Sequence, residues 1–172
     1  MDRNLGATRV ATSVNDASGY GDYFQWGRPA DGHEKQIVNG TAVNYTNIRS
    51  STSVPIDSKY IFPTDGGIND WLSTPDNTLW TGIDAPNNPC PSGFRIPTLA
   101  EWLIEKSYFT SNDVNGTFEN GYGLKLTTAG MATSSNGITA IGVYGQYLTQ
   151  TAYSTGQVRY FGVISGGTWD DN

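Results

Sequence analysis

The side chains that could carry out acid–base chemistry are few. His33 is the only histidine among the 172 residues, and it lies in a short polar stretch between Asp31 and Glu34. A single histidine excludes a multi-histidine metal site and leaves a Ser-His-Asp arrangement with one candidate base. Polar loop side chains more commonly cap nearby backbone groups. We therefore predict that residues 31–34 form a turn with local hydrogen bonds, and that the protein is not an enzyme.

Side chains with oxygen atoms that could bind calcium are plentiful. They occur in segments 69–71, 76–77 and 169–172. A Ca²⁺ ion needs about six to eight converging oxygen ligands, and the sequence contains no EF-hand loop. Asp and Asn in loops commonly form Asx turns instead. We predict no metal and no cofactor, and calcium is the alternative.

Tyrosine and tryptophan are interleaved with small polar residues in the C-terminal part of the chain. Rigid rings beside adaptable hydroxyl and amide groups are typical of binding surfaces, and such rings also stack on sugars. Because alternation along a strand directs about half of the side chains inward, only some of these rings are expected at the surface. A polar strand face that binds only water is the alternative. The predicted ligand-binding residues are Tyr144, Tyr147, Thr149, Gln150, Tyr153, Gln157, Tyr160, Trp169, Asp170, Asp171 and Asn172.

Two helices are expected upstream of these residues. Residues 97–109 show a helical period, and Thr98 with Glu101 forms a capping box, in which each side chain bonds the backbone of the other residue. A second, shorter helix is expected to begin at residue 111 or 112 and to end at Phe118. Asn115-Gly116 weakens it.

The remaining signals indicate short strands and loops. Residues 141–148 and 157–164 are the best strands, and we predict that they form an antiparallel pair. The segment 31–88 has few periodic apolar residues, yet it contains too many large rings for a disordered segment. We therefore expect an ordered, loop-rich layer there. Its rings are Tyr45, Tyr60, Phe62, Trp71 and Trp80.

Composition and charge exclude several classes of protein. The net charge is −6, and the 10 Lys and Arg residues are scattered, which argues against a nucleic-acid partner. No window approaches the roughly 20 apolar residues of a membrane span, so no membrane insertion is expected. Charged residues make up 15% of the chain, against about 25% in typical soluble domains. Such a polar but weakly charged surface suits an extracellular or virion setting.

Three stretches of the sequence occur in a specific order. They are MDRNLGA at 1–7, YGDYFQWGR followed by DGHE within 20–34, and NNPCPSGFRIPT followed by EW within 87–102. Together they resemble the Fibrobacter succinogenes major paralogous domain, which is abundant in surface and secreted proteins of Bacteroidetes and their relatives. Residues 126–130 and 142–151 are similar to the later half of that domain. The resemblance therefore spans nearly the whole chain.

The resemblance implies a C-type lectin-like fold of the α+β class, with a twisted antiparallel sheet, one or two helices and a long loop-rich region. The fold is related to the formylglycine-generating enzyme and to the variable receptor-binding proteins of phage diversity-generating retroelements. That enzyme works through cysteine chemistry. Cys90 is the single cysteine here, so it cannot supply a reactive pair. Members of this family often bind no calcium.

The chain also departs from the family pattern. Family members usually continue into a final strand, whose "VRC" cysteine is expected to pair with the counterpart of Cys90. Their usual Trp-Ser-Ser is also replaced here, by Leu-Thr-Gln at residues 148–150. In that fold the terminal strands pair with each other, so a missing last strand leaves an open edge that recruits another strand. We therefore expect residues 1–172 to be a single domain that belongs to a longer polypeptide or is completed by a neighbouring subunit.

These observations together predict a non-catalytic recognition or adhesion module at an extracellular or cell surface. It would bind a glycan or a protein through its C-terminal strands and loops. The alternative is a structural subunit, or a receptor-binding or decoration module, of a virion, fibre or cell-surface appendage. In that case the same polar face would contact a further copy of the chain or another assembly neighbour.

Overall fold

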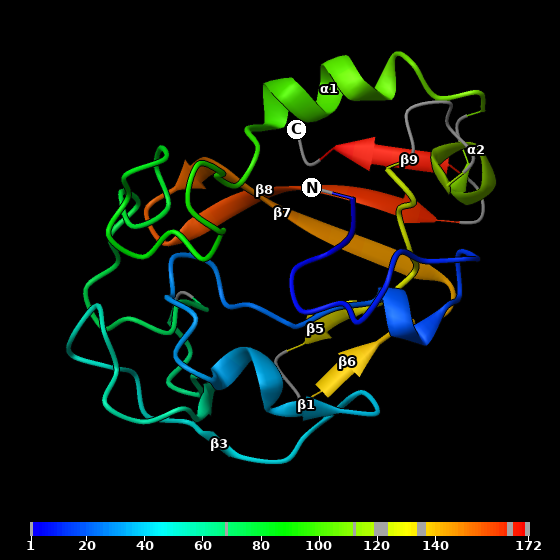
Figure 1. Ribbon diagram of the computed structural model, residues 1–172. Coiled ribbons are helices and arrows are strands. Elements are labelled where there is room, and N and C mark those ends of the chain that lie inside the picture. Colours follow the sequence, from blue (N-terminus) through cyan, green and yellow to red (C-terminus); the bar gives the residue numbers. More distant parts are fainter. Residues whose placement is uncertain are drawn as a thin grey trace.

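The computed structural model describes residues 2–67, 69–111, 113–118, 124–133, 137–164 and 167–170. Its elements form three layers, with helices above a three-stranded antiparallel sheet and a loop-rich layer with short strands below it (Figure 1). This combination of few helices and several antiparallel sheets is compatible with the predicted α+β class. Among the described residues, no helix has the length and apolar character needed to cross a membrane.

The central sheet has the strand order β7-β8-β9. Its strands are β7 (Tyr144–Ser154), β8 (Gln157–Ile164) and β9 (Gly167–Asp170). β7 and β8 are antiparallel and are joined by a tight turn at Gly156, whose φ is +70°. The predicted strand pair is confirmed, although β7 continues beyond residue 148. The register of the pair shifts between Leu148 and Ala152 and again between Ala152 and Ser154.

Helix α1 (Leu99–Lys106) lies within the range predicted for it and carries the predicted capping box. Thr98 Oγ1 accepts a hydrogen bond from Glu101 N–H at 3.1 Å, and Glu101 Oε2 accepts one from Thr98 N–H at 2.8 Å. Arg95 donates to both carboxylate oxygens of Glu101, at 2.6 and 2.8 Å. The bonds from Arg95 and Thr98 lower the pKa of Glu101 to about 2. This carboxylate therefore stays charged and fixes the start of α1.

Replacing Thr98 by alanine removes one half of the capping box and leaves the other. We expect Thr98→Ala to lower the free energy of unfolding by about 1 kcal/mol, the usual effect of removing such a cap. Chemical denaturation monitored by circular dichroism measures the change, and Thr98→Ser, which keeps the hydroxyl, is the control. Equal stability of the alanine variant and the wild type would contradict the assigned role of Thr98.

A tryptophan packs α1 against the central sheet. Trp102 stacks on Phe161 of β8, with ring centroids 4.9 Å apart and an angle of 2° between the ring planes. Phe161 and Val163 are wholly buried in the cluster that also contains Leu126. The predicted second helix is confirmed as α2 (Val114–Phe118), which contacts β8 beside this cluster. Both helices therefore contact β8.

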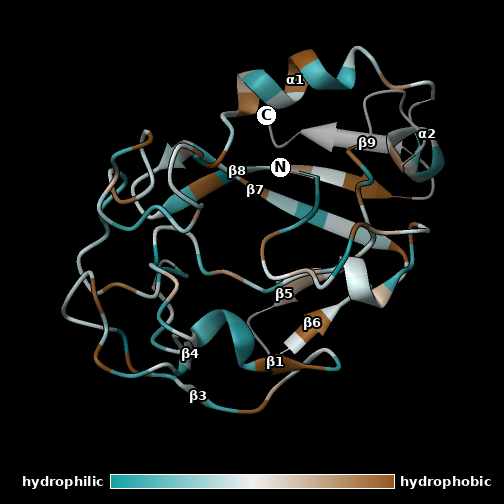
Figure 2. Cartoon of the chain, viewed as in Figure 1, coloured by the Kyte–Doolittle hydropathy of each residue, from teal (hydrophilic) through white to brown (hydrophobic). Residues whose placement is uncertain are grey.

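The predicted loop-rich layer is confirmed as ordered. It contains four strands of two residues each: β1 (Ile37–Val38), β2 (Thr41–Ala42), β3 (Tyr45–Thr46) and β4 (Tyr60–Ile61). β1 and β2 join β6 (Gly137–Thr139) and β5 (Met131–Thr133) in one sheet, whereas β3 pairs with β4 in parallel. Hydrophobic and hydrophilic segments are mixed along the layer (Figure 2). Buried rings hold it in place, and these are Tyr60, Phe62, Trp71 and Trp80.

The N-terminal segment differs from the expectation drawn from the resemblance. Residues 2–36 contain two short 3₁₀ turns, Ala17–Gly19 and His33–Lys35, and no β-strand. The expected first strand with unpaired amides is therefore absent from this part of the chain. Backbone bonds hold the segment instead, from Asp22 N–H to Leu5 O and from Thr128 N–H to Val14 O.

Candidate functional site

Just before β5, the chain meets β7 at a single bridge. Beyond this bridge, a cleft opens between the two strands. Gly130 and Gly145 form an isolated bridge, in which Gly130 N–H donates to Tyr144 O at 2.6 Å and Gln146 N–H donates to Gly130 O at 3.3 Å. Past this bridge, no backbone hydrogen bond joins the described residues of β5 and β7. Two adjoining hollows of about 270 and 240 Å³ lie there. Both are lined by Phe24, Tyr60, Ala132, Gln146 and Leu148.

We call this pair of hollows the Gln146 cleft. The larger one is the Asp70 hollow, because Asp70 lines it, and the smaller one is the Trp102 hollow. Each is slightly smaller than the roughly 300–1,000 Å³ usual for small-molecule sites. Because the two hollows adjoin, the cleft has room for a ligand with more than one ring.

The edge of β7 presents main-chain groups to the cleft. The N–H groups of Gln146 and Gln150 both point away from β8, toward Gly130 O and Pro97 O. Alternate residues of an antiparallel strand direct their N–H and C=O groups to the same side, so those of Leu148 face the same edge. In the described part of the chain nothing bonds them there. A donor and an acceptor in fixed positions are therefore free for a ligand.

The side chains of the cleft combine a free amide with fixed rings. The Gln146 carboxamide has no hydrogen-bond partner among the described residues. The indole N–H of Trp26 donates to Thr149 O at 2.9 Å, and that of Trp71 donates to Trp26 O at 2.7 Å. Phe24 and Trp26 are only partly buried. The cleft thus offers a ligand both apolar ring surface and oriented polar groups.

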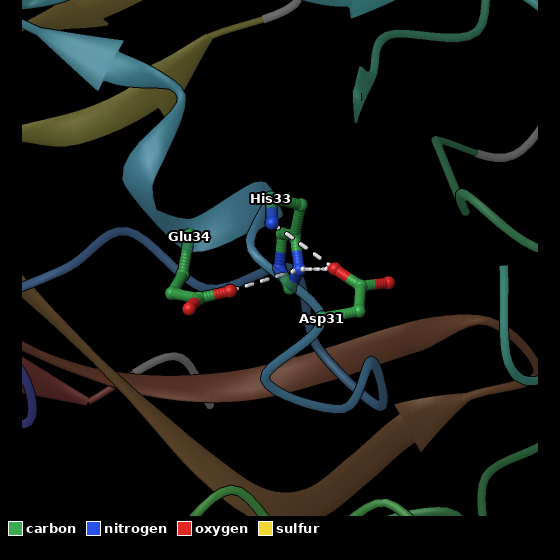
Figure 3. Close-up of side chains that lie close together, drawn as sticks. All are labelled: Asp31, His33 and Glu34. Carbon is green, nitrogen blue, oxygen red and sulfur yellow. Dashed lines mark hydrogen bonds and ion pairs between the residues drawn. The ribbon is translucent and has the colours of Figure 1, made fainter. Parts of the chain in front are cut away.

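Asp31, His33 and Glu34 lie together behind the cleft (Figure 3). The ring of His33 is wholly buried, its Nδ1 lies 2.7 Å from Asp31 Oδ1, and its Nε2 accepts a hydrogen bond from Gln25 N–H at 2.9 Å. These partners fix the neutral tautomer with its proton on Nδ1. Both ring nitrogens are occupied, so His33 has no free lone pair for a metal ion or a substrate proton. The predicted turn with local hydrogen bonds is confirmed.

Gln25 connects this cluster to the wall of the cleft. Its side chain donates to Ile61 O at 2.7 Å and accepts from Ile61 N–H at 3.0 Å. It also accepts from Arg28, which is wholly buried and pairs with Asp31 at 2.8 Å. Residues 24–26 line the cleft. The buried cluster therefore acts structurally, by holding these residues in place.

Cys90 provides little nucleophilic chemistry. It is a free, half-buried thiol, and burial raises its pKa. A raised pKa reduces the fraction of reactive thiolate.

No protein family, curated protein or solved structure matches the chain. The chemistry of the site therefore rests on its own residues.

Three of the predicted ligand-binding residues point into the protein. Tyr144 is 4% exposed and Thr149 is fully buried. Tyr147 also lines the Trp102 hollow, and its hydroxyl donates to Thr127 O at 3.0 Å and accepts from Thr127 N–H at 2.6 Å. Burial raises the pKa of Tyr147. Tyr144 and Thr149 offer a ligand no exposed side chain, which corrects their placement on a binding surface.

Two predicted glutamines already have partners within the protein. Gln150 Oε1 accepts a hydrogen bond from Gly82 N–H at 2.7 Å, which ties β7 to the loop layer. Gln157 Oε1 accepts one from the hydroxyl of Ser154 at 2.6 Å, across the β7–β8 turn. Gln150 is partly buried, whereas Gln157 is exposed.

Of the remaining predicted residues, Tyr153 and Tyr160 do not line the cleft. Tyr153 is 58% exposed, and the guanidinium of Arg159 lies 4.2 Å from the centre of its ring. Tyr160 is half-buried on β8. Trp169 and Asp170 belong to β9, but their side chains lie outside the described residues, as do Asp171 and Asn172 entirely.

Sequence reasoning missed Gln146 and Leu148, which lie between the predicted residues of β7. The alternation of the strand was the available signal, because it places residues 144, 146 and 148 on one face and residue 147 on the other. The predicted set contained residues of both faces and left open which of them are exposed. Asp70 was considered only as a calcium ligand, and nothing local connects it to β7.

Proposed function

We propose that this chain is a non-catalytic recognition module that binds a glycan in the Gln146 cleft at an extracellular or cell surface. The observation that carries the proposal is the set of unpaired polar groups of Gln146 and Leu148 beside fixed aromatic rings. A sugar has apolar C–H faces that pack on rings. Its hydroxyls both donate and accept, and a carboxamide and a peptide group satisfy both roles.

The resemblance to the Fibrobacter succinogenes major paralogous domain supports the same proposal. The three stretches that carry the resemblance are far apart in the sequence, yet each contributes residues to the lining of the Trp102 hollow. These residues include Leu5, Phe24, Pro97 and Trp102. We extend the proposal to the C-type lectin-like fold that the resemblance implies.

The carboxylates of the cleft are divided between its two hollows, and one of them is engaged in an ion pair. Glycoside hydrolases of the usual kind need two carboxyl groups on either side of the scissile bond. Among the described lining residues, the Asp70 hollow holds one carboxylate and the Trp102 hollow holds one, Asp22. Asp22 is already paired with Lys35 at 2.8 Å.

Binding to a glycan array tests the proposal, with two glutamine variants compared. We expect Gln146→Ala to weaken binding by about tenfold or more, the effect of losing well-formed hydrogen bonds. Gln157→Ala removes the same group from the outer turn and is the matched control, which should bind like the wild type. Binding that survives Gln146→Ala but disappears in Gln157→Ala would place the ligand on the outer turn and contradict the cleft.

A structural role in a virion, fibre or surface appendage is the second candidate. The outer side of α1 favours it, because Ile104 is 62% exposed and Tyr108, just beyond the helix, is 52% exposed. Apolar side chains gathered at a surface commonly mark a contact with another protein. Sedimentation that shows assembly as concentration rises, together with an empty glycan array, would favour this role.

A further inference from the structure

One carboxylate in the cleft is buried without a matching charge. Asp70 is only 7% exposed. Its Oδ1 accepts a hydrogen bond from Leu72 N–H at 2.8 Å, and no described residue bonds its Oδ2. Oδ2 faces Gly156 at the β7–β8 turn, since a Cβ added to that glycine would lie 2.9 Å from it. Asp70 and Gly156 both line the Asp70 hollow.

No cation among the described residues forms an ion pair with Asp70. Arg49 is close enough to favour the ionised form of Asp70, but its guanidinium bonds both carboxylate oxygens of Asp65, at 2.7 and 2.9 Å. Burial is the larger effect and raises the pKa of Asp70. A buried carboxylate without a cation is costly, and such groups cluster at functional sites.

The surroundings of Asp70 select among the cations that could fill the hollow. A calcium ion needs about six to eight oxygen ligands, whereas Asp70 is the single carboxylate among the described lining residues. Trp26 and Trp71 line the same hollow, and aromatic faces attract ammonium groups. The guanidinium of Arg28 already lies over the ring of Trp71, 5.7 Å from its centre, so this attraction falls mainly to Trp26. A protonated amine is small, donates hydrogen bonds and gains from both features.

We infer that the Asp70 hollow binds the protonated amino group of an amino sugar. This inference rests on the proposed function and specifies its ligand class. The ammonium donates to Asp70 Oδ2 beside the tryptophan rings, and the sugar ring extends toward Gln146 and Leu148. An acetylated amine lacks the charge, and a hydroxyl leaves the buried carboxylate uncompensated.

Three related sugars test the inference by NMR titration at neutral pH: glucosamine, N-acetylglucosamine and glucose. We expect the wild type to bind glucosamine about tenfold or more tightly than the other two, as charge-assisted hydrogen bonds imply. Asp70→Asn should abolish this preference. It keeps an oxygen for Leu72 N–H and removes a desolvated charge, so its Tm should not fall. Asp76→Asn, an exposed carboxylate in a nearby loop, should bind like the wild type.

Equal affinity for the three sugars, a preference that survives Asp70→Asn, or no binding of any of them would overturn the inference. Array binding that depends on Gln146 would still uphold the proposed function in each of these cases. If glucosamine binding requires Asp70 while array binding is unchanged in Gln146→Ala, the amine site is supported. The Gln146 cleft is then overturned as the glycan site.

Discussion

Replacing His33 by alanine is expected to lower the free energy of unfolding by about 3–5 kcal/mol, because a cavity and lost hydrogen bonds act together. The ring is wholly buried and contacts Phe24 and Tyr60, with centroids 6.0 and 5.9 Å away. Without it, Gln25 N–H loses its acceptor and Asp31 loses a donor. Urea denaturation measures the change.

A second variant separates the lost volume from the lost hydrogen bonds. His33→Phe keeps an aromatic ring against Phe24 and Tyr60 but removes both nitrogens. We expect it to lower the free energy of unfolding by about 2–3 kcal/mol, the effect of leaving buried polar groups without partners. If His33→Phe were as stable as the wild type, the hydrogen bonds of the cluster would not hold the cleft wall.

The same cluster makes stability depend on pH. Burial lowers the pKa of His33 below its ordinary 6.5, against the opposing effect of Asp31. At pH values below 6.5 the unfolded chain therefore binds more protons than the folded chain, and stability falls as the solution is acidified. We expect the wild type to lose stability between neutral pH and the folded-state pKa. His33→Phe should lack this component, and parallel pH profiles for the two proteins would contradict it.

Replacing Gly145 by alanine is expected to destabilise the protein by about 3 kcal/mol or to prevent folding, as overpacking against rigid neighbours does. A Cβ at this position would clash with Thr127 O, a backbone atom, and would lie 2.9 Å from Val163 Cγ2. The bridge between Gly130 and Gly145, which closes one end of the cleft, would have to open. Thermal unfolding measures the effect.

Gly67 provides the matched control for this substitution. An added Cβ there meets only side-chain atoms, of Arg49 at 3.1 Å and of Asp65 at 3.4 Å. Both atoms lie at the ends of flexible side chains that can shift, Asp65 being exposed and Arg49 partly buried, so Gly67→Ala should change the free energy of unfolding by less than about 0.5 kcal/mol. If both substitutions lowered the free energy of unfolding equally, the close approach of Thr127 O to β7 would not be the cause of the loss at Gly145.

Local patterns explain which parts of the fold could be predicted. The start of α1 depends on Thr98 and Glu101, three positions apart, and the β7–β8 pair depends on alternation within each strand and a short turn. Both signals are contained in a few consecutive residues. The turn at Asp31 and His33 was predictable for the same reason, because its first hydrogen bonds are local.

The cleft could not be predicted, because its geometry depends on contacts between distant residues. Trp71 bonds the backbone of Trp26, and Asp70 faces Gly156 across the layer. No short pattern encodes these contacts. The free edge at Leu148 depends on the divergence of β5 from β7, which neither strand specifies alone. Sequence reasoning therefore located only the first half of β7, residues 144–148, placed three turn residues before it in the strand, and misjudged which of its side chains are available to a ligand.

The most direct test of the central claim is to map backbone amide shifts by NMR while titrating a glycan that the array selects. If a glycan binds in the Gln146 cleft through the free edge of β7, the amide of Leu148 and the side-chain amide of Gln146 should shift most. The amides of Tyr153 and Gln157 on the outer turn should stay in place. The largest shifts at Tyr153 and Gln157, with Leu148 and Gln146 unchanged, would contradict the claim.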